Sequence, residues 1–119
     1  MKDFRQLSVW QKSHDLTLTL YQLTTSFPRE EMYGLTAQIR RAASSIPANL
    51  AEGCGTDGDA ELARYCPIAR ASASELEYHL LLARDLKLIK ADDYAQATER
   101  VVEIKRMLSG LIQKLNADR

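Results

Sequence analysis

Apolar residues recur at steps of three and four along most of the chain, which is the spacing of α-helices that bury one face. No segment alternates apolar and polar residues for long enough to predict a sheet. The pattern divides into four helical segments separated by short breaks. It therefore predicts an all-α protein.

The first predicted helix runs from near Ser8 to about Ser26, because Pro28 disfavours helical geometry at Phe27. Ser8 and Gln11 have the spacing of a capping box at its start. Its core stripe consists of Val9, Leu16, Leu20 and Leu23.

Large residues in a second row lie beside this stripe and make the apolar face wider than one neighbouring helix requires. The row comprises Trp10, His14, Leu18 and Tyr21. We expect Trp10, Leu18 and Tyr21 to contact another subunit.

The second predicted helix begins between Arg29 and Glu31, where acidic side chains suit the positive end of the helix dipole, and ends between Gly53 and Gly55. One face carries the apolar residues Leu35, Ile39, Ala42, Ile46 and Leu50. Beside it lies a polar stripe of Gln38, Arg41, Ser45, Asn49 and Glu52. Pro47 removes one hydrogen bond inside this helix and predicts a bend near residues 44–46.

The third predicted helix opens between Thr56 and Asp59, and Pro67 predicts a second local bend within it. Its centre is made of small residues that let a partner helix approach closely: Ala69, Ala71, Ser72, Ala73 and Ser74. The last helix starts at Asp92 or Asp93 and carries an unbroken heptad seam of Tyr94, Ala97, Val101, Ile104, Leu108, Leu111 and Leu115. Three short connections favour an up-down-up-down four-helix bundle.

A chain of 119 residues with 45% hydrophobic residues suits one domain, residues 1–119, with a core of its own. No run approaches the length of about 20 apolar residues that crosses a bilayer, and no signal peptide is visible, so we expect a cytoplasmic protein with no membrane partner. In such a compartment Cys54 and Cys66 stay thiols.

Signatures of catalysis, metal binding and nucleotide binding are missing from the sequence. A di-iron bundle needs two Glu-x-x-His pairs, and the residues three positions before His14 and His79 are Gln11 and Leu76. The glycines at 53, 55 and 58 lack the remainder of a phosphate-binding loop. We therefore predict a protein that is not an enzyme and has no metal or other cofactor.

Charge is balanced, with 16 basic and 16 acidic residues, so the chain lacks the basic excess of a typical nucleic-acid binder. Phosphate binding then depends on how arginines are placed, and the candidates are Arg40, Arg41, Arg64 and Arg70.

Arginine in the polar stripe has two interpretations. Its fork can grip a phosphate, and it can equally hold a carboxylate such as Glu52 or Glu75 within the bundle. We favour a structural network, because buried charged groups need hydrogen-bonding partners. The network would comprise Gln38, Arg41, Ser45, Asn49, Glu52 and Glu75.

Three segments carry a family resemblance: DFRQLSVWQKS at 3–13, FPREEMYGLTAQIRRAASSIPANLAEG at 27–53 and IARASASEL at 68–76. They resemble the four-helix-bundle proteins encoded in intervening sequences of bacterial 23S ribosomal RNA genes. The resemblance implies an up-down bundle assembled as a homo-oligomer, a ring of five subunits, with no known enzymatic activity.

A related branch, the accessory variability proteins of diversity-generating retroelements, is similar in fold and binds nucleic acid and a reverse transcriptase through a basic surface. Arg40 and Arg41 match the QIRRA segment shared with that branch, whereas the neutral charge of this chain departs from it.

Two functional hypotheses follow. The first is a homopentameric adaptor that associates with RNA or DNA, and the alternative is a protein-interaction scaffold that binds another protein and no nucleic acid.

Overall fold

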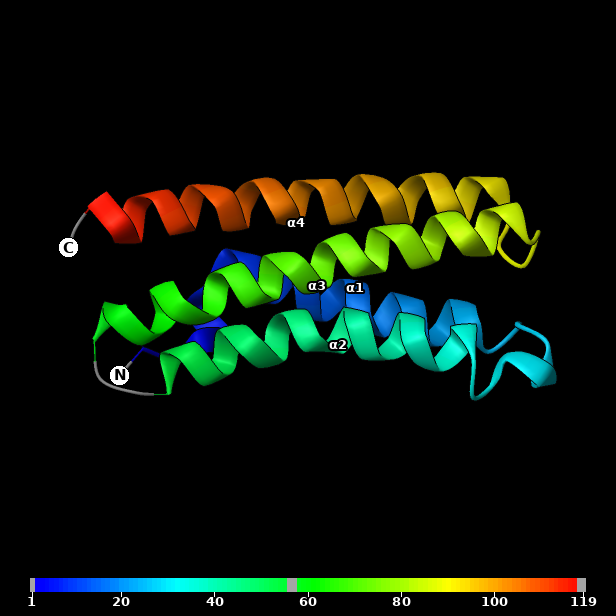
Figure 1. Cartoon of the computed structure of the whole chain (residues 1–119), viewed down its shortest axis with the longest axis horizontal. Helices are drawn as coiled ribbons and strands as arrows, with labels where there is room; N and C mark the ends of the chain where they lie inside the picture. Colours follow the sequence, from blue (N-terminus) through cyan, green and yellow to red (C-terminus); the bar gives the residue numbers. More distant parts are fainter. Residues whose placement is uncertain (1, 56–57, 118–119) are drawn as a thin grey trace.

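The computed structural model describes residues 2–55 and 58–117 and contains four long helices (Figure 1). They are α1 (Ser8–Thr24), α2 (Leu35–Cys54), α3 (Asp59–Asp85) and α4 (Ala91–Ala117). Short 3₁₀ turns, η1 (Phe4–Gln6) and η2 (Arg29–Glu31), precede α1 and α2. The described residues include no strand, so the all-α four-helix prediction is confirmed.

Neighbouring helices run antiparallel in an elongated molecule of 46 × 21 × 19 Å (Figure 1). Polar contacts fix the directions: Arg41 and Ser45 of α2 meet Glu75 and Ser72 of α3 in reverse order. The connection between α1 and α2 lies at the same end as the turn between α3 and α4 (Figure 1). Both ends of the described chain lie at the other end.

All four helices contribute an apolar stripe to one core. Fully buried side chains include Leu16 and Leu20 of α1, Ile39, Ile46 and Leu50 of α2, Leu76 and Leu80 of α3, and Val101, Ile104 and Leu108 of α4. Alanines at 42, 69, 73 and 83 are buried between them and keep the helices close. The periodic residues of the sequence therefore form the core.

The first helix begins at the predicted residue, but the predicted capping box of Ser8 and Gln11 does not form. Ser8 is the first helical residue, Leu7 occupies the cap position, and no side chain caps the helix. Gln11 instead donates its Nε2–H to the Arg5 carbonyl at 2.8 Å. The helix ends at Thr24, two residues before the predicted Ser26.

The predicted start of the second helix between Arg29 and Glu31 is wrong. Those residues form η2, and α2 begins only at Leu35, after Gly34. The Glu31 carboxylate accepts a hydrogen bond from the Leu35 N–H at 3.1 Å and so satisfies one orphan donor of α2. The η2 turn is therefore not part of α2, but the Glu31 side chain of η2 caps the first turn of α2.

The remaining boundaries agree with the sequence to within one or two residues. α2 ends at Cys54, α3 opens at Asp59, and α4 opens at Ala91, one residue before Asp92. Thr56, part of the predicted opening of the third helix, lies outside the described residues. Pro47 and Pro67 both lie inside continuous helices, and the bends expected there stay predictions.

No helix within the described residues is both long and apolar enough to span a bilayer.

Candidate functional site

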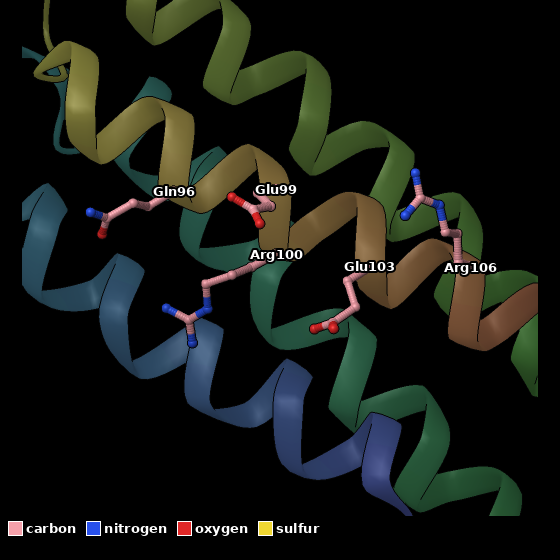
Figure 2. Close-up of a pocket in the computed structure, with 5 residues that line it drawn as sticks. All are labelled: Gln96, Glu99, Arg100, Glu103 and Arg106. Atoms are coloured by element: carbon pink, nitrogen blue, oxygen red, sulfur yellow. The ribbon is translucent and has the colours of Figure 1, made fainter.

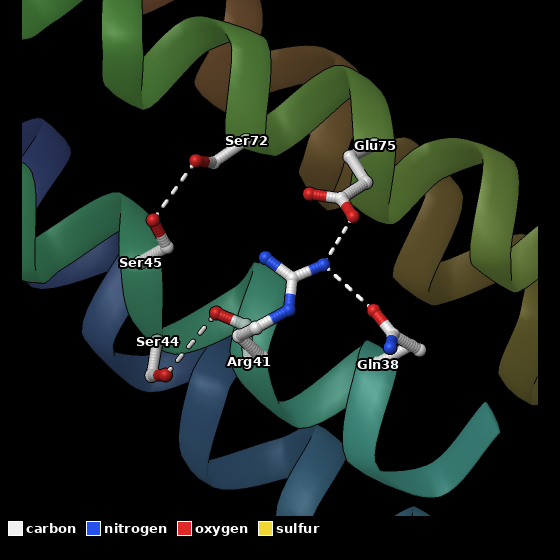
Figure 3. A network of polar contacts seen from close by, with 6 residues as sticks. All are labelled: Gln38, Arg41, Ser44, Ser45, Ser72 and Glu75. Atoms are coloured by element: carbon white, nitrogen blue, oxygen red, sulfur yellow. Dashed lines mark hydrogen bonds and ion pairs between the residues drawn. The ribbon is translucent and has the colours of Figure 1, made fainter. Parts of the chain in front are cut away.

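Polar side chains line the outer junction of α2 and α3, and we call this set the polar seam (Figure 3). Its members are Gln38, Arg41, Ser45 and Asn49 of α2 with Ser72 and Glu75 of α3. Helical spacing places the four α2 residues on one side of the helix, as the sequence predicts.

Within the seam, two separate groups of hydrogen bonds form. The Arg41 guanidinium donates to the Gln38 amide oxygen at 2.7 Å and to the Glu75 carboxylate (Figure 3). One turn further along α2, the Ser45 and Ser72 hydroxyls lie 2.9 Å apart, and the Asn49 amide donates to the Ser45 carbonyl at 2.7 Å. The Arg41 fork thus holds a carboxylate in this subunit.

The contacts of Glu52 and Ser72 differ from those that the sequence predicts. Glu52 is exposed and makes no ion pair with a described residue, whereas Ser72, which the sequence marked only as small, bonds Ser45. The side chains of Arg41 and Glu75 are 54% and 38% exposed, so their ion pair contributes little to stability.

His79 lies beside the seam on α3. Burial lowers the pKa of its imidazole, while the Glu75 carboxylate raises that pKa and the Arg41 guanidinium lowers it. Its Nδ1 atom is buried and has no hydrogen-bond partner within the described part of the chain. The histidine therefore favours its neutral form.

Two of the four candidate phosphate-binding arginines are neutralised by carboxylates. Arg41 pairs with Glu75, and Arg64 pairs with Glu61 at 3.4 Å. Arg64 also lies over the ring of Tyr65, with 5.4 Å between its Cζ and the ring centroid.

Arg40 and Arg70, the other two candidates, bond hydroxyls instead. Arg70 of α3 donates to the Ser109 hydroxyl of α4 at 3.1 Å, and Arg40 of α2 donates its Nε–H to the Thr24 hydroxyl of α1 at 2.9 Å. Neither has a carboxylate within 4.0 Å among residues 2–55 and 58–117. Arg40, Arg41 and Arg70 therefore lie at three different helix junctions, and the contacts of Arg64 stay within α3, so the four arginines do not share a common partner.

The predicted subunit-contact residues divide into a packed and an exposed part. Trp10 is half-buried, in edge contact with Phe4 and stacked on His14 at 4.8 Å. Leu18 and Tyr21 are 52% and 43% exposed. Of the three predicted contact residues, Leu18 and Tyr21 are thus open to a partner over much of their area.

A polar hollow of about 370 Å³ lies along α4 beside α1 (Figure 2). Gln96, Glu99, Arg100, Glu103 and Arg106 line it. Arg100 points towards α1, where it donates to the Thr19 hydroxyl at 3.1 Å. Acidic and basic groups alternate along this surface, as on a solvated helix face.

The two cysteines are free and buried. Burial raises the pKa of the Cys66 thiol to about 11 and also raises the pKa of Cys54, so both are protonated near neutral pH and are weak nucleophiles. No set of three or more His, Cys, Asp or Glu side chains in the described ranges is placed to hold a metal ion.

Comparison with known proteins adds a family and a fold. The sequence model of the family described as 23S rRNA-intervening sequence protein matches residues 5–110. A crystal structure of a protein of unknown function from the S23 ribosomal protein family of Bacteroides thetaiotaomicron is similar, with a TM-score of 0.77 and 25% sequence identity. The similarity covers 87% of this chain and 97% of that one. No curated protein matches the chain.

Proposed function

Since this chain belongs to the family of 23S rRNA-intervening sequence proteins, we propose that it is a non-enzymatic homopentamer that serves as an RNA- or nucleic-acid-associated adaptor. The family description connects these proteins with ribosomal RNA, and it assigns no reaction to them.

The observation that carries the proposal is the state of Arg40 and Arg70. Hydroxyl groups orient both guanidiniums, and no described carboxylate neutralises them. An arginine that bonds one hydroxyl keeps further N–H donors for a phosphate. Five copies in a ring would repeat each such group five times, and a basic surface results if the ring gathers them on one side, away from the acidic groups.

Exposed apolar residues support assembly into a ring. Leu18 and Tyr21 form one exposed pair on α1, and Ile68 and Tyr78, at 44% and 57% exposure, lie on α3. Exposed apolar residues on two different helices suit a head-to-tail contact, in which the α1 surface of each copy meets the α3 surface of the next. Head-to-tail contacts form a ring when the rotation between successive copies closes, whereas a two-fold dimer requires one self-complementary patch.

Fluorescence anisotropy tests the nucleic-acid part of the proposal. A labelled fragment of 23S ribosomal RNA and an unrelated RNA of equal length are titrated with nuclease-treated protein across a salt series. We expect affinity that falls as salt rises, because phosphate contacts release counterions. Absence of binding to either RNA at low salt contradicts the proposal.

Variants locate the binding surface. Arg70→Gln removes one unneutralised guanidinium and is expected to reduce the salt dependence of log K by about 0.7 for each single-strand phosphate that Arg70 neutralises. The matched control is Arg84→Gln, because the Arg84 guanidinium already pairs with Asp85 at 3.0 Å. Equal effects of the two substitutions would argue against a role for Arg70.

The alternative function is a protein scaffold with no nucleic-acid role. It is favoured by Tyr33, which is 92% exposed beside the start of α2, and by Leu86 at the end of α3, which is 53% exposed. Exposed apolar residues of this kind mark protein-binding surfaces when they cluster. A labelled RNA that never binds, together with an intact homo-oligomer, would favour this alternative.

A further inference from the structure

A hollow of about 350 Å³ is lined by residues of the connection between α1 and α2 and of the adjoining helix ends. This connection lies at the right-hand end of Figure 1. We call the hollow the Arg29–Arg40 pocket. Its polar wall contains the guanidinium side chains of Arg29 and Arg40 and the hydroxyl residues Thr24 and Thr36. No carboxylate residue among those the structure describes lines it.

Arg40 is held in this wall by contacts with α1. Its Nε–H donates to the Thr24 hydroxyl at 2.9 Å, its Nη2 donates to the Tyr21 carbonyl at 3.1 Å, and its Cζ lies 4.8 Å from the centroid of the Tyr21 ring. A guanidinium has five N–H donors, so these two hydrogen bonds leave three for a ligand. The fork is therefore orientated in advance, which lowers the entropic cost of binding.

Glu31, an acidic residue near the pocket, has its carboxylate engaged elsewhere, and the exposed Glu30 forms no ion pair with a described residue. Glu31 follows closely after Arg29 in the chain, and its carboxylate accepts the Leu35 N–H at the start of α2. Neither Arg29 nor Arg40 forms an ion pair with any residue in the described ranges. The pocket thus combines two cations with no acidic counter-charge from the described part of the chain in its lining.

The lining also has an apolar part, which we call the apolar wall. It consists of Phe27, which is 9% exposed, with Pro28 and the half-exposed Met32. A ligand that suits both walls has a compact anionic group joined to a flat, weakly polar body. A nucleotide has this composition, because its phosphate is a bidentate partner for arginine and its base stacks on apolar and aromatic side chains.

We propose that the Arg29–Arg40 pocket binds one phosphate group of RNA between the two guanidiniums, with the adjoining nucleoside against Phe27, Pro28 and Met32. This inference rests on the proposed nucleic-acid association and assigns it a subsite. Arg40 contributes an orientated fork and Arg29 contributes a second positive charge from the exposed turn η2.

The contacts of Arg40 with Tyr21 and Thr24 also stabilise the last turn of α1, since a cation near a helix C-terminus satisfies free carbonyls. That structural role accounts for Arg40 alone. The exposed Arg29 makes no hydrogen bond or ion pair through its side chain with the described residues, so no contact of its guanidinium supports the fold. Arg29 is consequently the better residue for a test, because its removal leaves the α1 cap intact.

Methionine methyl NMR provides the measurement. The sequence has three methionines, of which Met32 lines the pocket and Met107 packs against the core. The full-length protein is labelled at its methionine methyl groups and titrated with uridine 5′-monophosphate, with uridine, and with inorganic phosphate. We expect the nucleotide to shift the Met32 signal and leave Met107 unchanged, and uridine to bind at least about tenfold more weakly, the factor that one charge-assisted hydrogen bond supplies.

Arg29→Gln is expected to weaken the nucleotide titration by about tenfold for the same reason. Arg106→Gln is the matched control, since it removes an exposed arginine from α4 far from η2 in the sequence. The inference is overturned if the Met32 signal does not move, if uridine matches its monophosphate, or if Arg106→Gln weakens binding as much as Arg29→Gln. A response to inorganic phosphate that equals the response to the nucleotide would overturn the assignment of the apolar wall.

The same variants separate this inference from the proposed function. If RNA binds the wild-type protein and Arg29→Gln equally, and Met32 is unaffected by the nucleotide, the adaptor function stands and the pocket assignment is wrong. If the nucleotide shifts Met32 while RNA fails to bind, the pocket accepts a free nucleotide and its assignment to RNA is wrong.

Discussion

At the scale of single residues, helical spacing predicts which side chains share a face, and it does not predict their partners. Gln38, Arg41, Ser45 and Asn49 lie along one seam because their angular positions follow from their sequence spacing. Their partners depend on how α2 and α3 are aligned along their length. The helical period of each sequence segment does not determine this alignment. For this reason the sequence suggested Glu52 as a possible partner of Arg41 and missed Ser72.

Gly53 allows α2 and α3 to approach closely, and this gives a stability prediction. A Cβ at this position would lie 3.1 Å from the Leu62 Cα, a backbone atom that cannot turn aside. We expect Gly53→Ala to lower the free energy of unfolding by about 1–2 kcal/mol, since overpacking outweighs the gain in helix propensity. Gly110→Ala on α4 is the control, because a Cβ there meets nothing within 4 Å. That substitution should stabilise the protein by about 0.5–1 kcal/mol, and urea denaturation of both variants checks the pair.

His79 predicts a pH dependence of stability. Burial holds the pKa of the folded imidazole below its ordinary value of 6.5, so the unfolded chain binds more protons in the window just below that pH. The contribution of His79 to the free energy of unfolding therefore has its full value above about pH 6.5 and is lost as the pH falls through the pKa of the folded state. The measurement is the difference in unfolding free energy between wild type and His79→Gln across this window. A difference that stays constant or grows in favour of the wild type on acidification would contradict the prediction.

At the scale of elements, the sequence predicts the number and cores of the helices better than their ends. Four apolar stripes suffice to locate α1 to α4, because each stripe must be buried to fold. The start of α2 was misplaced because Glu30 and Glu31 suit a helix N-terminus, whereas the intervening η2 turn and Gly34 separate them from α2. A favourable charge pattern does not decide whether a turn continues as a helix.

The two helical prolines differ in burial and therefore in the predicted effect of replacing them. Pro67 is exposed on α3, so Pro67→Ala restores a hydrogen bond and relieves a clash without disturbing the core. We expect a gain of about 1–3 kcal/mol in unfolding free energy. Pro47 is buried in α2, and Pro47→Ala should gain less because it also leaves a gap in the core. Thermal denaturation that leaves Pro67→Ala at or below the wild-type midpoint would refute this account of α3.

At the scale of the whole molecule, neutral net charge does not mean that every charge is neutralised. Seven ion pairs join described residues, and yet Arg29, Arg40, Arg70 and Arg100 belong to none of them. Composition predicts only the sum of the charges. The distribution depends on how side chains meet across helix junctions, and on any assembly that repeats them.

Oligomerisation is tested by a charge placed in the exposed α1 patch. Leu18 is 52% exposed, so Leu18→Asp should leave the subunit folded and disfavour burial of this surface against another copy. We expect light scattering to change from the mass of five chains to that of one, 13.4 kDa. Gln113→Asp on the exposed side of α4 is the control and should keep the wild-type mass. Circular dichroism verifies that both variants are helical.

The central claim is that a ring of these subunits carries RNA, and fluorescence-detected sedimentation tests it most directly. A labelled 23S ribosomal RNA fragment is sedimented alone and with the protein, at low and at high salt. The account predicts that the RNA moves with an additional mass of five subunits at low salt and returns to its free rate at high salt. An RNA that sediments at its free rate under all conditions, or a protein that sediments at 13.4 kDa, would contradict it.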